Sequence, residues 1–337
     1  MSNRPTIKTI AEQAGVSHVT VSKALRDEPD ISVATKEKIK GIAHELGYTP
    51  NKAARNLYLK RSGAIGVVVP AMGGDTAYDI VFNEISALAA ERDYCVMLGS
   101  SHRSIQLEER HCRMMAENQV GILIVASCTS ETAHIKAACG SVPVIFIGGK
   151  TCQEEQNNIF CDYYNSGALA VKHLAKQGHK DIALLTYEPG NNTILQKEAG
   201  FSAAMEDKGL TPRILRVGEA SDTMSAGKKA VELLLEQGKL PTALCCASDY
   251  MALGVKVALK LHGLSVPKDV SVMGHDDLDF SSYPDVDLTT IRTPMRQLGQ
   301  AAAELAIALM EHNDSIPSRQ VFQPTLVVRG STGAARR

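Results

Sequence analysis

Residues 17–23 combine the side chains whose types and spacing point to the most specific chemistry in the sequence. Lys23 can donate hydrogen bonds to guanine or to a phosphate, and the hydroxyls of Thr20 and Ser22 can bind phosphates or base edges. On a helix, Val19 shares this outward face although it is apolar, and the methyl group of a thymine would satisfy it. The pattern favours contact with double-stranded DNA. The alternative is a packing module of three helices with one exposed valine.

Helical patterns on both sides predict how this segment is held. A first helix buries one apolar stripe and ends at Gly15, a residue type common just after helices; the stripe is Ile7, Ile10, Ala11 and Ala14. Ser17 is a suitable N-cap for the second helix, which turns Val21, Ala24 and Leu25 inward. A third helix is expected from near Ser32 to Gly47. Two short helices joined by a glycine-containing turn form a helix-turn-helix, whose second helix enters the major groove.

The distribution of charge agrees with an anionic partner. Residues 1–61 hold 11 Lys or Arg against 6 Asp or Glu, a net charge of +5, whereas the other 276 residues hold 25 against 31, a net of −6. A small basic segment on a large, mildly acidic body is typical of proteins that bind a polyanion.

A short helical stretch follows at residues 50–57, where basic Arg55 lies beside apolar Leu57. Proteins that bind the minor groove insert such apolar wedges between base steps. The alternative is a linker between domains whose leucine packs on the body.

From residue 62 onward, apolar runs of strand length alternate with helical patterns. The strand candidates are 64–70, 94–99, 120–126, 143–148, 181–186, 242–247 and 270–274, and the helix candidates are 77–92, 104–118, 165–177, 193–209, 223–237, 249–262 and 294–311. This alternation predicts an α/β fold of two doubly wound, mostly parallel sheets that face each other across a cleft. Ligands of such sheets bind beyond the carboxyl ends of the strands.

Hydroxyls, carboxylates and aromatic rings gather at those strand ends. They include Ser127, Asp162, Ser248 and residues 275–277, with Tyr78, Phe160, Tyr163 and Tyr187 nearby. This mixture suits a polyhydroxylated neutral ligand, and a nucleobase or a small amine would also fit. The alternative for each Asp or Ser is a helix N-cap, where these residue types are also common.

Motifs for catalysis or metal binding do not emerge. Residues 149–151 resemble the end of a phosphate loop, but position 144 is Val where the loop requires Gly. The ten histidines include no His-x-x-x-His pair, and His111 beside Cys112 is more typical of a solvated helix face than of a nucleophile with its base. No apolar run reaches the ~18 residues of a membrane span, and no secretory signal is visible. The eight cysteines then indicate reduced, mostly buried thiols. We therefore expect a cytoplasmic protein that is not an enzyme, with no cofactor, no metal and no membrane partner.

Long runs of the sequence resemble the lactose/galactose repressor (LacI/GalR) family of bacterial transcriptional regulators. The runs are 6–25, 47–51, 54–57, 142–145, 162–167, 178–183, 198–201, 247–254, 266–277, 288–291 and 330–332. The resemblance implies a helix-turn-helix domain at 1–49, a hinge helix and linker at 50–61, and a periplasmic-binding-protein-like core at 62–337. In that core, subdomain one would comprise about 62–163 plus 292–321, and subdomain two about 164–291 plus 322–331.

The resemblance also implies functions and site residues. The expected function is a ligand-responsive regulator, in this family most often a repressor, that binds a palindromic operator in double-stranded DNA as a homodimer. No apolar heptad follows residue 332, so we expect a dimer rather than a tetramer. The implied DNA-binding residues are Thr6, Ser17, His18, Val19, Thr20, Ser22, Lys23, Asn51, Ala54, Arg55 and Leu57. The implied effector-binding residues are Tyr78, Ser127, Asp162, Lys197, Ser248 and Asp276.

The small-molecule effector is expected to be a sugar or sugar derivative. The sequence departs from the family pattern in four places: Lys23 and Lys197 stand where arginine is frequent, Ser248 stands where asparagine is frequent, and residues 73–78 (Gly-Gly-Asp-Thr-Ala-Tyr) replace the usual Asn-Pro-aromatic. Lysine is a point charge and not a planar fork, so the groups recognised there will differ. The alternative function is a cytoplasmic solute-binding or sensor protein with the same core and a non-sugar ligand such as a nucleobase.

Overall fold

A computed structural model describes residues 5–48, 63–72, 77–149, 157–187, 192–218, 223–313 and 315–336. The chain divides into two compact units, residues 1–60 and 61–337. Among the described residues, no helix is long and apolar enough to span a membrane. The seven cysteines in these ranges are free thiols, and all but Cys95 are buried, as expected.

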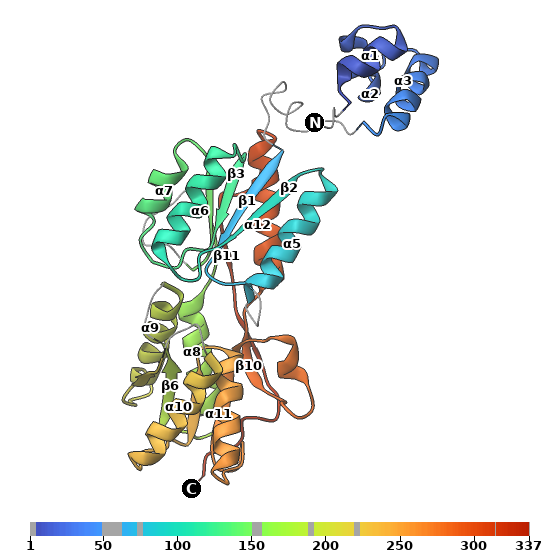
Figure 1. Cartoon of the computed structure of the whole chain (residues 1–337). Coiled ribbons are helices and arrows are strands. Elements are labelled where there is room, and N and C mark those ends of the chain that lie inside the picture. Colours follow the sequence, from blue (N-terminus) through green and yellow to red (C-terminus); the bar gives the residue numbers. More distant parts are fainter. Residues whose placement is uncertain are drawn as a thin grey trace. The chain divides into compact units, whose positions relative to one another are not determined.

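The first unit is a bundle of three helices, α1 (Ile7–Ala14), α2 (His18–Leu25) and α3 (Val33–Glu45) (Figure 1). Its core holds the predicted apolar stripes: Ile10, Ala11, Ala14, Val21, Ala24, Ile39 and Ala43. Gly15 ends α1 with a left-handed φ of 71°, a conformation that glycine adopts without steric cost. Ser17 and Ser32 cap α2 and α3 by accepting hydrogen bonds from the backbone amides of Thr20 and Thr35. The predicted helix-turn-helix is confirmed.

The second unit contains two six-stranded sheets, and its first sheet has the strand order β11-β5-β4-β3-β1-β2. The strands are β1 (Ala64–Val69), β2 (Cys95–Ser100), β3 (Ile122–Val125), β4 (Val144–Gly148), β5 (Asn158–Cys161) and β11 (Arg319–Phe322), all paired in parallel. Helices α5 (Ala77–Glu91) and α12 (Met295–Met310) pack on one face of this sheet, and α6 (Ile105–Glu117) and α7 (Ala133–Cys139) on the other (Figure 1).

The second sheet has the order β12-β10-β9-β8-β6-β7. Its strands are β6 (Ile182–Thr186), β7 (Arg213–Arg216), β8 (Ala243–Cys246), β9 (Ser271–Asp276), β10 (Thr289–Arg292) and β12 (Thr325–Val327). Only the β10–β12 pair is antiparallel among the pairings of the described strands. Helices α8 (Tyr163–Lys176) and α9 (Asn192–Glu206) cover one face, and α10 (Thr223–Glu236) and α11 (Asp249–Leu261) cover the other.

The chain passes between the two sheets three times. It leaves the first sheet after β5 for α8, returns after β10 to α12, and leaves again from β11 to β12. Strands far apart in the sequence therefore lie in the same sheet, and several predicted site residues lie at or just after their carboxyl ends. The predicted α/β class with two mostly parallel sheets is confirmed.

Candidate functional site

The outward side of α2 exposes the residues that the sequence singled out for DNA contact. Ser17 and His18 are exposed, and the side chain of Val19 is 51% exposed, whereas Val21 and Ala24 on the opposite side are fully buried. An apolar residue exposed to this degree contributes nothing to the core of the bundle. It is available to a partner surface.

Three polar residues of this face already have partners within the bundle. The hydroxyls of Ser17 and Thr20 lie 2.9 Å apart, and Lys23 forms an ion pair with Asp30 on the loop before α3. The hydrogen bond to Asp30 raises the pKa of Lys23. Asp30 was not anticipated from the sequence, because a loop carboxylate seven residues away carries no helical signal.

The remaining predicted DNA-binding residues differ in their exposure and in whether the structure describes them. Thr6 is exposed and caps α1, exchanging hydrogen bonds with Thr9 in a capping box. Ser22 is half-buried on α2. Asn51, Ala54, Arg55 and Leu57 lie outside the described residues.

In the second unit, three of the predicted effector residues interact electrostatically. Asp276 ends β9, Lys197 lies in α9, and Tyr78 lies in the first turn of α5. Burial raises the pKa of Tyr78 to about 12, and the charge of Asp276 adds to this rise although it comes from the other sheet. Asp276 also acts on Lys197, whose pKa burial lowers. The coupled residues are distant in the sequence, since Tyr78 and Asp276 are 198 positions apart.

Asp276 is held as an ionised carboxylate. Its Oδ1 accepts hydrogen bonds from Nδ1 of His275 at 2.9 Å and from the hydroxyl of Thr293 at 3.2 Å. Burial opposes ionisation, but the charges of His275 and Lys197 and the two hydrogen bonds outweigh it, so the pKa of Asp276 is about 2. The Nε2 atom of His275 is buried and has no hydrogen-bond partner in the described part of the chain.

Lys197 is a buried cation that no carboxylate of the described residues contacts, although the charge of Asp276 acts on it from further away. Its side chain donates one hydrogen bond, from Nζ to the carbonyl oxygen of Ala247 at 3.1 Å, and Nζ stands 5.1 Å from the ring centroid of Tyr163. The residue is only 8% exposed, and no carboxylate in the described ranges forms an ion pair with it. Among the described residues, the three N–H groups of this ammonium therefore have a single carbonyl acceptor, and the ring of Tyr163 lies close to Nζ.

The other three predicted effector residues have local structural roles. Asp162 caps α8 by accepting from the amide of Asn165 at 3.0 Å, and Ser248 caps α11 by accepting from the amide of Met251 at 3.2 Å. Ser127 donates to Oε1 of buried Glu108 at 2.8 Å. The N-cap alternative weighed from the sequence thus describes the local bonding of Asp162 and Ser248.

Aromatic rings and one unforeseen cation complete the group. The ring of Tyr163 lies 5.8 Å from that of His275, and Tyr187 is buried at the end of β6. Arg103, which follows β2, acts electrostatically on both Tyr78 and Tyr187. Neither Arg103 nor Thr293 was predicted, because an exposed loop arginine and a threonine after a short strand have no distinctive sequence signal.

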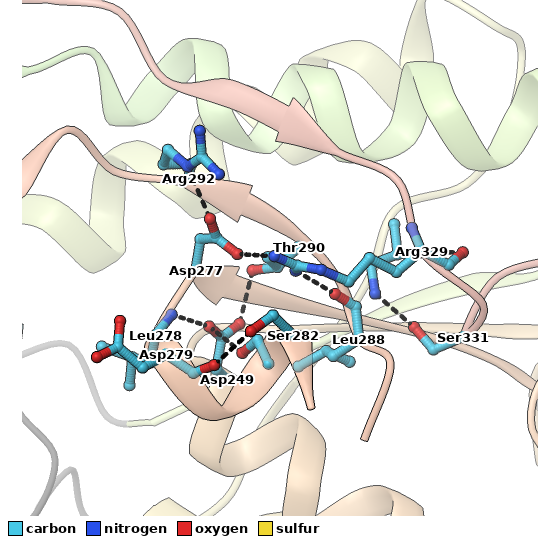
Figure 2. A network of polar contacts seen from close by, with 12 residues as sticks. Asp249, Asp277, Leu278, Asp279, Ser282, Leu288, Thr290, Arg292, Arg329 and Ser331 are labelled. Atoms are coloured by element: carbon cyan, nitrogen blue, oxygen red, sulfur yellow. Dashed lines mark hydrogen bonds and ion pairs between the residues drawn. The ribbon is translucent and has the colours of Figure 1, made fainter. Parts of the chain in front are cut away.

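A second carboxylate, Asp249, fixes the turn after β9 (Figure 2). It accepts hydrogen bonds from the amide of Leu278 at 2.7 Å, the hydroxyl of Ser281 at 2.7 Å and that of Thr290 at 2.6 Å. Burial and the charge of Asp276 raise its pKa to about 7 despite these donors. Within the described residues, no cluster of His, Cys, Asp and Glu could hold a metal ion.

Comparison with known proteins decides the family. Residues 6–51 match the family described as "Bacterial regulatory proteins, lacI family", and residues 171–332 match a periplasmic binding protein-like domain. The HTH-type transcriptional repressor CytR of Escherichia coli (strain K12) is 30% identical over 330 residues, which cover 98% of this chain and 96% of CytR. The chain belongs to the LacI family of bacterial regulatory proteins.

Solved structures of LacI-family proteins share the fold. The lac repressor dimer bound to operator and the anti-inducer ONPF has a TM-score of 0.89 and 29% identity, covering 98% of this chain and 100% of that one. The transcriptional regulator CelR in complex with cellobiose has a TM-score of 0.71 and 25% identity, covering 97% of this chain and 100% of CelR. These LacI-family relatives are transcriptional regulators, not enzymes.

Proposed function

We propose that the protein is an effector-responsive transcriptional repressor that binds a palindromic operator as a homodimer. The observation that carries the proposal is the outward face of α2, which combines a 51% exposed Val19 with exposed His18 and with Lys23. An apolar side chain among hydrogen-bond donors matches a major-groove edge, where thymine methyl groups alternate with acceptors. The lac repressor, which is similar over nearly the whole chain, was solved as a dimer on operator DNA.

A mobility-shift experiment tests DNA binding. The full-length protein is mixed at low salt with a pool of duplexes containing random inverted repeats, and bound duplexes are recovered and sequenced. We expect enrichment of palindromes and a steep loss of affinity as salt rises, because phosphate contacts release counterions. Absence of binding to every duplex at low salt would overturn the proposal.

Exposed apolar side chains on one edge of the first sheet support the dimer. β2 is an edge strand, and Leu98 on it is 40% exposed; on neighbouring α6, Ile105 and Met114 are 44% and 45% exposed. Unpaired strand edges with apolar side chains tend to associate with other chains. An edge of this kind that the chain itself leaves exposed is therefore usually covered by a partner. We assign this surface to the partner subunit.

The group around Asp276 is proposed as the effector site. Asp276 can only accept hydrogen bonds, so it selects a hydroxyl or an N–H group of the effector. Lys197 can only donate, so it selects an oxygen or an unprotonated nitrogen. A sugar diol supplies both kinds of group, and CelR, a relative with 25% identity, was solved with cellobiose. A nucleobase also supplies both, and the rings of Tyr78, Tyr163 and Tyr187 favour it as the alternative because planar ligands stack on rings.

A thermal-shift screen separates these effectors. Neutral sugars, sugar phosphates, nucleobases and nucleosides are each added to the protein, since a ligand of the folded state raises the melting temperature. We expect one class to give a concentration-dependent rise that Asp276→Ala abolishes, while Asp276→Ala still binds DNA. An effector response that is unchanged in Asp276→Ala would exclude this residue from the site.

A further inference from the structure

We propose that Asp277 is a positioning residue that transmits changes at Asp276 to β10 and to the segment after β12, next to two of the three passages between the sheets. The inference rests on the proposed function, because Asp276 matters here as the effector contact. It adds a physical connection between that contact and the strands on which the relative placement of the two sheets depends.

The backbone of the turn is strained. Asp276 has a φ of 108° and Asp277 a φ of 58°, and neither is glycine. Side chains of L-residues disfavour such angles, so two successive ones persist only where the surroundings impose them. Asp249 supplies one constraint by accepting from the amide of Leu278 and from Ser281 just beyond the turn.

Asp277 supplies the other constraint through two arginines (Figure 2). Its Oδ2 accepts from Nε of Arg292 at 2.7 Å, and its Oδ1 accepts from Nη2 of Arg329 at 2.7 Å. The carboxylate side chain is only 7% exposed. Arg329 is itself fixed, because its Nη1 donates to the carbonyl oxygen of Leu288 at 2.7 Å and its side chain is 16% exposed.

The two arginines that bind Asp277 lie next to passages of the chain between the two sheets. Arg292 is the last residue of β10, directly before the chain returns to α12. Arg329 lies two residues after β12, which the chain enters directly from β11. One nearly buried carboxylate therefore holds both strands, and it shares a peptide bond with Asp276. Charge-assisted hydrogen bonds at 2.7 Å are short and strong, so the turn cannot shift without moving the strands or breaking these bonds.

Hydrogen–deuterium exchange on the full-length protein tests the connection without any effector. Four proteins are compared: wild type, Asp276→Asn, Asp277→Asn and the double variant. Asp276→Asn serves as the probe, because it removes the charge that an effector would contact. We expect it to change amide exchange in 289–292 and 325–329 by roughly threefold or more in the wild-type background. In the Asp277→Asn background the same substitution should leave these segments unchanged.

Two further variants keep the test decisive. Glu198→Gln is the control: Glu198 also is a 7% exposed carboxylate bound to an arginine, Arg216, at 2.7 Å, but on α9. Asp276→Asn should retain its full effect in that background. If Asp277→Asn does not fold, Arg292→Gln replaces it, since Arg292 is 54% exposed and its loss leaves the core intact.

An equal effect of Asp276→Asn with and without Asp277 would overturn the inference, and so would the absence of any effect on the two segments in the wild-type background. Neither result depends on DNA binding. A protein that shifts no duplex but shows the coupling would contradict the proposed function alone, and one that binds DNA without the coupling would contradict only the role of Asp277.

Discussion

Gly149 and Thr193 approach each other so closely that no side chain fits between them. A Cβ atom at Gly149 would lie 2.9 Å from Cγ2 of Thr193 and 3.4 Å from its backbone nitrogen. Gly149 directly follows β4 of the first sheet, and Thr193 is in the first turn of α9, which packs on the second. The absence of a side chain at Gly149 therefore allows elements of the two sheets to touch.

Gly149→Ala should consequently lower the free energy of unfolding by about 1 kcal/mol, because it overpacks this contact. Thr193→Ser removes Cγ2 and should restore most of that loss when combined with Gly149→Ala. Urea unfolding of wild type, the two single variants and the double variant measures the coupling as a double-mutant cycle. If Gly149→Ala has the same effect with and without Thr193→Ser, the two residues do not meet in solution.

In the first unit, Asp30→Asn should strengthen DNA binding, because Asp30 competes with DNA for Lys23. The gain should be roughly fivefold or less, because an exposed ion pair is weak. The substitution frees Lys23 from its partner. Asp27→Asn is the matched control: Asp27 binds Lys40 on α3 at 2.6 Å, so the net charge changes equally while Lys23 keeps its partner. Fluorescence anisotropy with a recovered duplex at two salt concentrations measures both. Equal gains from the two variants would show that only net charge matters.

The main elements of the fold were predictable because they bury continuous apolar stretches. All seven strand candidates and all seven helix candidates correspond to elements of the structure, within a few residues at each end. Among the described elements, helix α7 and strand β5 were also missed: α7 has only seven residues, and β5 is buried but only four residues long, too short to stand out as a strand. The missed edge strands lack a continuous apolar run. β7 and β12 are only partly buried edge strands, and β11, at the edge of the other sheet, alternates exposed and half-buried residues.

β10 escaped prediction for a different reason. It begins with two threonines, which are fully buried although they are polar. Thr289 accepts a hydrogen bond from the amide of Arg329 at 2.9 Å, and Thr290 donates to Asp249 at 2.6 Å. The partners come from distant segments, so no local pattern reveals that these hydroxyls are satisfied.

The candidate site shows the same limit. Positions at strand ends indicated Asp276 with Tyr78 nearby, and the family resemblance implied Lys197. Neither could tell these residues from Asp162 and Ser248, which cap helices. Capping is a local property, whereas the absence of a described carboxylate in contact with Lys197 depends on the whole fold. The roles of these residues in effector binding remain predictions.

Lys197→Met should stabilise the free protein by about 1–3 kcal/mol, because the cost of burying a cation that no carboxylate contacts outweighs the attraction of the more distant Asp276, and a thioether chain of similar length avoids that cost. The same variant should lose the thermal shift that wild type shows with its effector. Lys197→Arg, which keeps the charge, serves as the control and should retain part of that shift. Urea unfolding and the effector screen give the two readouts. A destabilised Lys197→Met protein would argue that the lysine serves the fold rather than a ligand.

The dimer surface provides a further test. Leu98→Asp places a charge on edge strand β2, where the partner subunit is expected, and should weaken association at least roughly tenfold, since an unpaired charge in an interface is costly. Leu261→Asp is the control, because Leu261 is 79% exposed at the end of α11 in the other half of the unit. Sedimentation velocity over a concentration series measures both variants. A dimer unaffected by Leu98→Asp would remove β2 from the interface, and a stable wild-type tetramer would contradict the expected assembly.

Asp249 makes the stability of the protein depend on pH in a predictable direction. Its pKa is about 7 in the folded protein against 3.8 for the unperturbed group, so the folded state binds the extra proton between these values. The stability that this group contributes is therefore fully present below about pH 4, and up to about 4 kcal/mol of it is lost as the pH rises to about 7.

Asp249→Asn cannot ionise and retains an oxygen that accepts from Thr290 or Leu278. The difference in unfolding free energy, variant minus wild type, should thus become more positive from about pH 5 to about pH 7.5 in urea titrations. Taking the difference cancels the titration of the other groups, which both proteins share. A difference that is constant, or that falls with pH, would mean that Asp249 is ionised throughout and that its three donors outweigh burial.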